Sequence, residues 1–174
     1  MLRKILLWGV IGGAIAGGLL SLAVLVLGRH DMASGYLIML LGLSTIFVAI
    51  KRQRDLEQGG VIRFGQALGL GLAISLIAGL VYVAIWESSV ALAGIDFAGD
   101  YARGVIAQAK ARGASAAELA RLNAQMAQFQ AHYDDPLFRW PMTFIEIFPV
   151  GVLVSIVSAG LLCNSRFLPA RQRA

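Results

Sequence analysis

Two acidic residues and one proline are the residues of this chain whose types and positions could do chemistry. Glu146 lies within a long apolar run, one helical turn before Pro149, and Glu87 follows directly after another such run. A carboxyl group inside a membrane is costly, and such a residue is a candidate site for a proton, a cation or a substrate. A structural role is the alternative, in which Glu146 is neutral or pairs with a basic residue such as Arg139.

Pro149 predicts a kink and a polar cluster beside it. Proline has no N–H group, so the carbonyl of Ile145 loses its helical partner. An unpartnered carbonyl in hydrocarbon costs several kcal/mol. The nearest donors are Thr143, a water molecule or a neutral Glu146. We therefore expect Glu146 to face the interior of a helical bundle, near Tyr82–Glu87.

No other set of residues is typical of an enzyme, a metal site or a cofactor site. H-E-x-x-H, G-x-S-x-G and P-loop motifs do not occur, and Cys163 is the one cysteine. His30 stands in a short polar loop with no second ligand near it. We predict no catalytic, cofactor-binding or metal-binding residues, and an enzyme is the least favoured class.

The composition indicates a membrane protein. Of the 174 residues 58% are hydrophobic and 14% are charged, with a mean hydropathy of +0.74, whereas about a quarter of a soluble domain is charged. The net charge of +5 does not predict nucleic-acid binding, because the basic residues cluster beside the apolar runs. We expect a lipid bilayer as a partner and no nucleic acid.

Four apolar runs predict four transmembrane helices. The run Gly65–Trp86 would reach about 33 Å as a helix, enough to cross a bilayer core. The first run is too long for a signal peptide and no cleavage site follows it. The predicted spans cover residues 5–27, 33–50, 65–86 and 140–163. The sequence therefore predicts an all-α, single-domain membrane protein (1–174), with the spans as a four-helix bundle.

Small residues recur every fourth position in three of these spans. Such spacing places them on one helical face, where they let another helix approach closely. The predicted packing faces contain Gly9, Gly13 and Gly17 in the first span, Gly71, Ser75 and Gly79 in the third, and Gly151 and Ser155 in the fourth.

The polar segment between the third and fourth spans predicts a helical hairpin over residues 96–133. Gly113 is placed to end its first helix, and Ser115 with Glu118 matches a capping box that starts the second. An apolar stripe then follows, formed by Leu119, Leu122, Met126, Phe129 and Tyr133. The stripe could meet the other helix, rest on the membrane or bind a partner. Asp134-Asp135-Pro136 should stop the second helix.

The basic residues predict the orientation. Nine of the 15 fall on one side of the spans, namely Arg3, Lys4, Lys51, Arg52, Arg54, Arg63, Arg166, Arg171 and Arg173. By the positive-inside rule this side, with both termini, is cytoplasmic, and the hairpin is extracytoplasmic. The basic tail Asn164–Ala174 is expected to be mobile.

Several segments resemble one known family. They include Ile50–Asp55, Gly59–Gly65 with Ala67, and Ile147–Gly151 with Ser155. The chain resembles a bacterial four-pass membrane family known as a domain of unknown function, DUF4199. The resemblance implies one domain in the bacterial inner (plasma) membrane and assigns no activity.

These observations favour a non-enzymatic membrane protein that assembles with itself or with a membrane-protein partner, because small-residue faces and the hairpin stripe are typical of helix association. The alternative is a small transporter or channel that uses Glu146, together with Glu87. No cofactor is expected.

Overall fold

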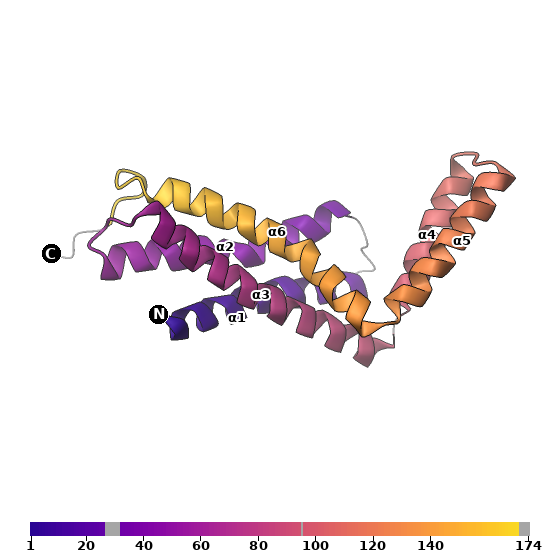
Figure 1. Cartoon of the computed structure of the whole chain (residues 1–174), viewed down its shortest axis with the longest axis horizontal. Coiled ribbons are helices and arrows are strands. Elements are labelled where there is room, and N and C mark those ends of the chain that lie inside the picture. Colours follow the sequence, from indigo (N-terminus) through magenta and orange to yellow (C-terminus); the bar gives the residue numbers. More distant parts are fainter. Residues whose placement is uncertain (27–31, 95, 171–174) are drawn as a thin grey trace. The chain divides into compact units, whose positions relative to one another are not determined.

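The structure is a computed structural model that describes residues 1–26, 32–94 and 96–170, and in these ranges it contains helices and no strands. The helices are α1 (Leu2–Leu25), α2 (Met32–Glu57), α3 (Phe64–Ala93), α4 (Phe97–Ala111), α5 (Ala116–Tyr133) and α6 (Pro136–Leu162) (Figure 1). The predicted all-α class is confirmed. The predictions for His30, Arg29, Arg171 and Arg173 concern residues outside the described ranges.

Four helices, α1, α2, α3 and α6, are long and apolar enough to cross a membrane, which confirms the predicted number of spans. The 24 residues of α1 reach about 36 Å. The other three helices run further than their apolar runs. α2 continues to Glu57, α3 continues to Ala93, and α6 begins at Pro136. These extensions contain many good helix formers, which continue a helix beyond the hydrocarbon.

The chain forms two compact units. The first, called here the bundle, comprises Met1–Glu87 and Phe144–Ala174, and the second, called the hairpin unit, comprises Ser88–Thr143. Helices α3 and α6 each contribute residues to both units. The expectation that residues 1–174 form a single domain stays a prediction.

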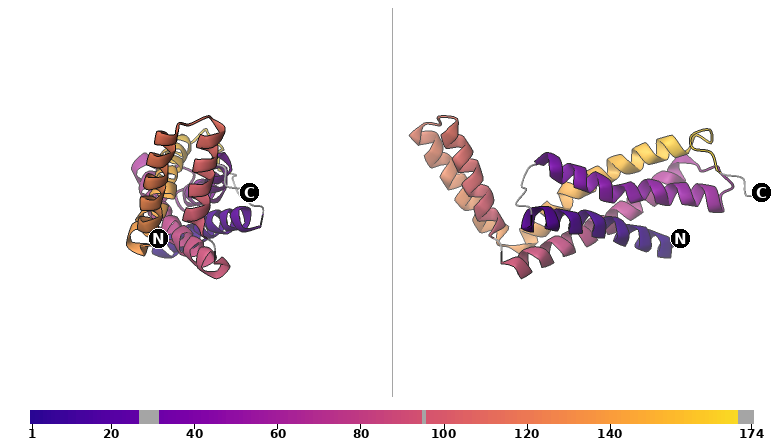
Figure 2. Two further views of the ribbon diagram at one scale, coloured as in Figure 1. Left: turned by 90° about the vertical axis from the view of Figure 1, so that its right-hand side faces the viewer. Right: turned by 180° about the vertical axis from the view of Figure 1, so that it is seen from behind.

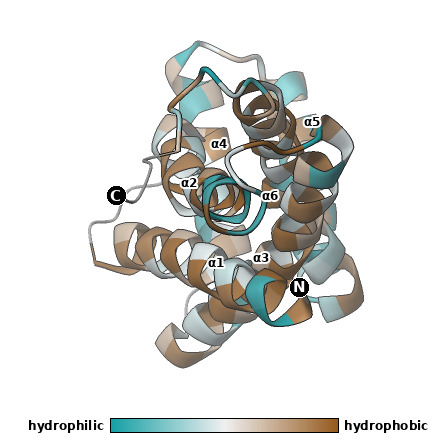
Figure 3. Cartoon of the chain, turned by 90° about the vertical axis from the view of Figure 1, so that its left-hand side faces the viewer, coloured by the Kyte–Doolittle hydropathy of each residue, from teal (hydrophilic) through white to brown (hydrophobic). Residues whose placement is uncertain are grey.

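The bundle has an apolar core and an apolar surface. Ile46 of α2, Ile74 of α3 and Ile147 of α6 are at most 1% exposed. On the surface the exposed fractions of four large side chains lie between 54% and 58%, those of Leu7, Leu41, Leu80 and Leu153. Hydrophobic colour accordingly covers most of the bundle ribbon, with hydrophilic colour at the start of α1 (Figure 3). Lipid is the environment that such a surface fits.

Local signals fix both ends of the hairpin helices. Asp96 caps α4 by accepting a hydrogen bond from the Gly99 N–H at 2.8 Å. At the other end Gly113 has a φ of 78°, and the Ala114 N–H donates to the Ala109 carbonyl at 3.1 Å, as in a Schellman motif. Ser115 accepts from the Glu118 N–H at 3.2 Å, as predicted for the start of α5.

Helices α4 and α5 lie side by side and antiparallel (Figure 2). Their contact includes aromatic pairs, with ring centroids 5.8 Å apart for Phe97 and Tyr133 and 5.7 Å apart for Tyr101 and Phe129. On α4 the buried positions are small, including Ala102. The predicted stripe of α5 is the less exposed side of that helix. Of the alternatives for this stripe, the structure shows contact between the two helices of the hairpin.

The start of α6 differs from the prediction. α5 ends at Tyr133, as expected, but Pro136 is the first residue of the next helix. Asp135 caps this helix, because its carboxylate accepts a hydrogen bond from the Leu137 N–H at 2.9 Å. Proline at the first helical position lacks only an N–H that the helix would leave unpaired. Asp-Pro is therefore a start signal here as well as a stop signal.

Candidate functional site

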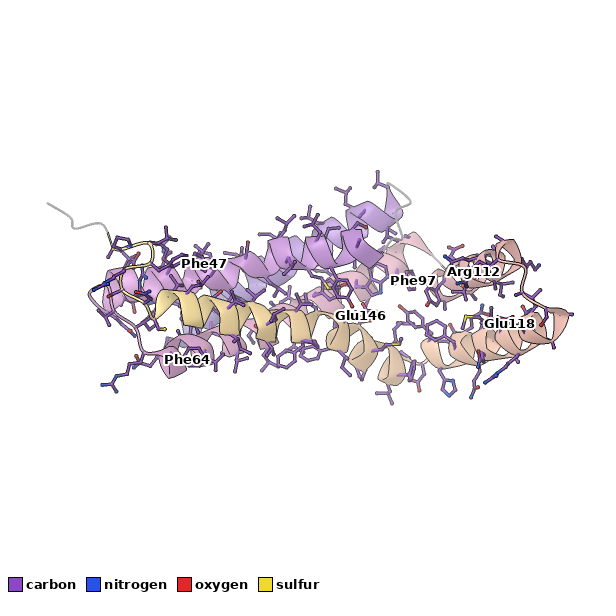
Figure 4. The ribbon with its side chains drawn as sticks, turned by 90° about the horizontal axis from the view of Figure 1, so that it is seen from above. Phe47, Phe64, Phe97, Arg112, Glu118 and Glu146 are labelled. Atoms are coloured by element: carbon purple, nitrogen blue, oxygen red, sulfur yellow. The ribbon has the colours of Figure 1, made fainter. Side chains whose placement is uncertain are left out.

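Glu146 lies on α6 (Figure 4). The residue is exposed. Its neighbours in sequence define its position, because Ile147 is 1% exposed and Ile145 is 66% exposed. Glu146 is therefore on the flank between the buried and the exposed sides of the helix. The prediction that it faces the interior is wrong. The buried side of α6 repeats every four residues through Thr143 and Ile147, and Glu146 is one position out of phase with it.

Glu146 forms no hydrogen bond or ion pair with any residue of the described ranges, and so none with Glu87. Glu87 itself is half-buried on α3, six residues before the end of that helix at Ala93. It does have an interaction with another residue. The two predicted carboxylates thus do not form a bonded pair.

Pro149 is exposed, and α6 is continuous through it. Ile145 lies one turn earlier on the same side, so the carbonyl that Pro149 leaves without a helical partner belongs to an exposed position. The predicted kink near Ile145–Phe148 stays a prediction. Two polar groups, the Glu146 carboxyl group and the Ile145 carbonyl, therefore lie at the exposed surface of a membrane-spanning helix.

The small residues of α1 lie against α3. A Cβ atom built on Gly9 would lie 2.5 Å from Cβ of Ile77, and one built on Gly13 would lie 2.7 Å from Cβ of Val81. A Cβ on Gly17 would lie 3.0 Å from Cβ of Ile85. Ordinary carbon contacts are about 3.5–4.0 Å, so only glycine allows this close approach.

The small residues of α3 and α6 form a reciprocal contact. A Cβ on Gly71 would lie 2.8 Å from Cβ of Ser155, and a Cβ on Gly151 would lie 2.8 Å from Cβ of Ser75. The two serine Oγ atoms are 3.1 Å apart and form a hydrogen bond. Further along α3, a Cβ on Gly79 would lie 2.6 Å from the Phe144 ring. The faces of both helices are thus used inside the bundle.

A contact between α1 and α2 escaped the sequence analysis. A Cβ on Gly42 would lie 2.7 Å from Cβ of Ala16 and 2.8 Å from the Gly12 carbonyl oxygen. Gly12 and Ala16 have the four-residue spacing of the other faces, which was the signal available in the sequence.

Arg54 is the main residue that the sequence analysis did not single out. Its side chain is 0% exposed. Nη1 donates to the Phe167 carbonyl at 2.9 Å and to the Leu162 carbonyl at 3.4 Å, and Nη2 donates to the Leu168 carbonyl at 2.5 Å. Nε donates to Asp55 at 2.6 Å. Arg54 therefore satisfies the last carbonyl of α6 and holds the segment after it.

The described residues after α6 pack against the bundle, which differs from the expected mobile tail. The Phe167 ring lies 6.5 Å from the ring of Phe47, in an edge-to-face arrangement. Cβ of Ala170 would lie 3.3 Å from a Cβ built on Gly60. The tail is held because Arg54 and an aromatic pair fix it to α2. Residues 171–174 lie outside the described ranges.

In the described part of the chain, no group of three or more His, Cys, Asp or Glu side chains is placed to hold a metal ion. The buried hydroxyl groups of Ser75 and Ser155 and the guanidinium of Arg54 instead connect α6 and the segment after it to α3 and α2. Four apolar helices joined by close small-residue contacts define a multi-pass helical membrane protein.

The chain belongs to the family described as Protein of unknown function (DUF4199), which matches residues 7–164. The resemblance noted in the sequence is thereby confirmed. No curated protein and no solved structure matches the chain.

Proposed function

We propose that this protein is a non-enzymatic membrane assembly protein, which binds a transmembrane helix through the exposed side of α6 around Glu146. The helix would come from another membrane protein or from a second copy of the chain. The observation that carries the proposal is an exposed carboxyl group without a partner among the described residues, in a membrane-spanning helix.

The depth of Glu146 makes its exposure costly. Trp140 is 50% exposed, and aromatic residues of this kind lie at membrane interfaces. At about 1.5 Å per residue, Glu146 lies about 9 Å further along α6, inside the hydrocarbon. An acidic group at mid-membrane costs about 2.5–3.5 kcal/mol, and somewhat less nearer the surface. A donor from a second helix would remove this cost, together with that of the Ile145 carbonyl.

The packing inside the bundle leaves the outside of α6 open to a partner. The glycines at Gly9, Gly13, Gly71 and Gly151 already contact neighbouring helices. Gly160, by contrast, is exposed and a Cβ built on it would meet nothing within 4 Å. Another helix can approach α6 closely there.

Transport is the alternative function. It needs Glu146, with or without Glu87, to line a polar path through the bundle. The exposed flank position of Glu146 favours assembly over transport, because a carboxyl group at the surface cannot line an interior path.

The size of the purified protein tests the proposal. In a mild detergent the wild-type chain should elute with more protein mass than its own 18.5 kDa, as a complex of fixed stoichiometry. Glu146→Leu should release the monomer, whereas Glu146→Gln, which keeps a donor and an acceptor, should release less. Glu118→Gln on α5 is the control and should leave the complex intact. A monomeric wild type without a stoichiometric partner would contradict the proposal.

We also propose the bacterial inner membrane as the location, with both termini in the cytoplasm. The support is the excess of basic residues beside one end of the spans. Reporter fusions after Gln58 should be cytoplasmic, and fusions after Gln108 should be extracytoplasmic. A cytoplasmic reporter at Gln108 would invert the topology.

A further inference from the structure

One end of the bundle carries more basic residues than its acidic residues can neutralise. This basic end contains the starts of α1 and α3, the end of α2 and the segment after α6. Its described residues include Arg3, Lys4, Lys51, Arg52, Arg54, Arg63 and Arg166, against Asp55 and Glu57. The end is therefore strongly positive.

The two acidic residues are already paired. Asp55 accepts hydrogen bonds from Lys51 and Arg54, and Glu57 forms an ion pair with Lys4. Four arginines of the basic end have no carboxylate partner among the described residues, namely Arg3, Arg52, Arg63 and Arg166. Their positive charge is available to a ligand.

Arg52 differs from the other three in its surroundings. Its guanidinium carbon lies 6.0 Å from the centre of the Trp8 ring, which belongs to α1. On α2 it lies one turn from Val48 and one turn from Leu56, which are 43% and 56% exposed. Exposed apolar residues on either side place Arg52 on the surface that faces lipid.

Lys4 belongs to the same neighbourhood. It lies one helical turn before Trp8 on α1, and its Nζ donates to the Gln53 side chain at 3.3 Å. Gln53 is the residue next to Arg52. Lys4 and Arg52 thus lie on facing helices, on either side of the seam between α1 and α2.

We propose that Arg52 and Trp8 bind the headgroup of an anionic phospholipid, beside Lys4, whose charge is already paired with Glu57. A planar guanidinium matches phosphate oxygens, and tryptophan is favoured at the level of lipid headgroups. The exposed apolar residue Val48, one helical turn further from the basic end, would contact the acyl chains. This inference does not depend on the function proposed for Glu146.

Quenching of Trp8 fluorescence tests the proposal. Trp86→Phe and Trp140→Phe leave Trp8 as the one tryptophan, which is excited selectively at wavelengths that the tyrosines do not absorb. The chain is placed in bilayers with brominated phosphatidylglycerol or brominated phosphatidylcholine. The relative binding constant should favour phosphatidylglycerol about fivefold, the effect of one basic group near an anionic surface. Arg52→Gln should remove most of this preference, whereas Arg63→Gln at the same end should retain it.

A second measurement covers the case in which the tryptophan variants do not fold. Native mass spectrometry of the unmodified chain should show more bound phosphatidylglycerol than phosphatidylcholine, and Arg52→Gln should lose the difference. Equal binding of the two lipids, or an unchanged preference in Arg52→Gln, would overturn the proposal. Competition by inorganic phosphate alone would assign the site to free phosphate and overturn the lipid as its ligand.

Discussion

The contact between α3 and α6 allows a quantitative test with a matched pair of variants. Gly71 and Gly69 are two residues apart on α3. A Cβ on Gly71 would lie 2.8 Å from Cβ and Oγ of Ser155 and 3.3 Å from Ile46. A Cβ on Gly69 would meet nothing within 4 Å. Gly71→Ala and Gly69→Ala are therefore the same chemical change in a crowded and in an open position.

The expected difference in the free energy of unfolding follows from two terms. In both variants the free energy of unfolding rises by about 1 kcal/mol, because alanine is a better helix former than glycine. Only Gly71→Ala forces α6 to move, by about 1 Å to restore ordinary carbon contacts. Overpacking of this kind costs about 1–3 kcal/mol. Gly71→Ala should therefore be less stable than Gly69→Ala by about 1–3 kcal/mol, since the helix term cancels.

The assay is unfolding by sodium dodecyl sulfate in mixed micelles, followed by circular dichroism. Gly69→Ala should be at least as stable as the wild type, which serves as the reference. Equal stability of Gly71→Ala and Gly69→Ala would refute the close contact of α3 with α6 at this position.

Three further predictions concern other contacts. In a double-mutant cycle, Ser75→Ala and Ser155→Ala should show a coupling free energy of about 0.6 kcal/mol, because the two serines share a hydrogen bond. Additive effects of the two substitutions on the free energy of unfolding in micelles would contradict this coupling. Arg54→Met should lower the free energy of unfolding by about 1–3 kcal/mol, because buried carbonyls lose their donor. Trypsin should then cleave faster after Arg166, and an unchanged cleavage rate would refute the role of Arg54 in holding the segment after α6. Ser115→Ala should cost about 1 kcal/mol through the lost cap of α5, seen as faster amide hydrogen exchange in α5 than in the wild type.

The sequence was sufficient for the number of spans and for the hairpin, because both rest on local signals. An apolar run of membrane length and the turn at Gly113 are properties of neighbouring residues. The helix that contains the fourth span begins before that span, at Pro136, although Asp135-Pro136 was interpreted only as a stop. The same two residues form a cap and a first helical position.

The direction in which Glu146 points depends on how α6 packs against α3, whereas the prediction rested only on the carbonyl freed by Pro149. The four-residue face of Gly151 and Ser155 extends backwards to Ile147 and Thr143, and not to Glu146. This periodicity was present in the sequence. The Ile145 carbonyl, which Pro149 leaves without a helical partner, gives no information on which side of α6 meets α3.

Arg54 was interpreted only as one of the basic residues that set the orientation. Its spacing contains a second signal, because Ile46, Ile50 and Arg54 recur every four residues and all are 0% exposed. No local sequence pattern identifies the carbonyl groups that accept the hydrogen bonds of Arg54. The Phe167 carbonyl lies 113 residues further along the chain and becomes its partner only when α2 and α6 pack together.

The most direct test of the proposed assembly is a photo-cross-link from the exposed side of α6. A benzoylphenylalanine residue is introduced at Leu153, which is 58% exposed, and as a control at Leu80 of α3, which is 55% exposed. In native membranes position 153 should give one discrete protein adduct, which Glu146→Leu should weaken, whereas position 80 should give lipid adducts. Lipid adducts alone at position 153, or the same protein adduct at both positions, would contradict binding of a helix at this surface.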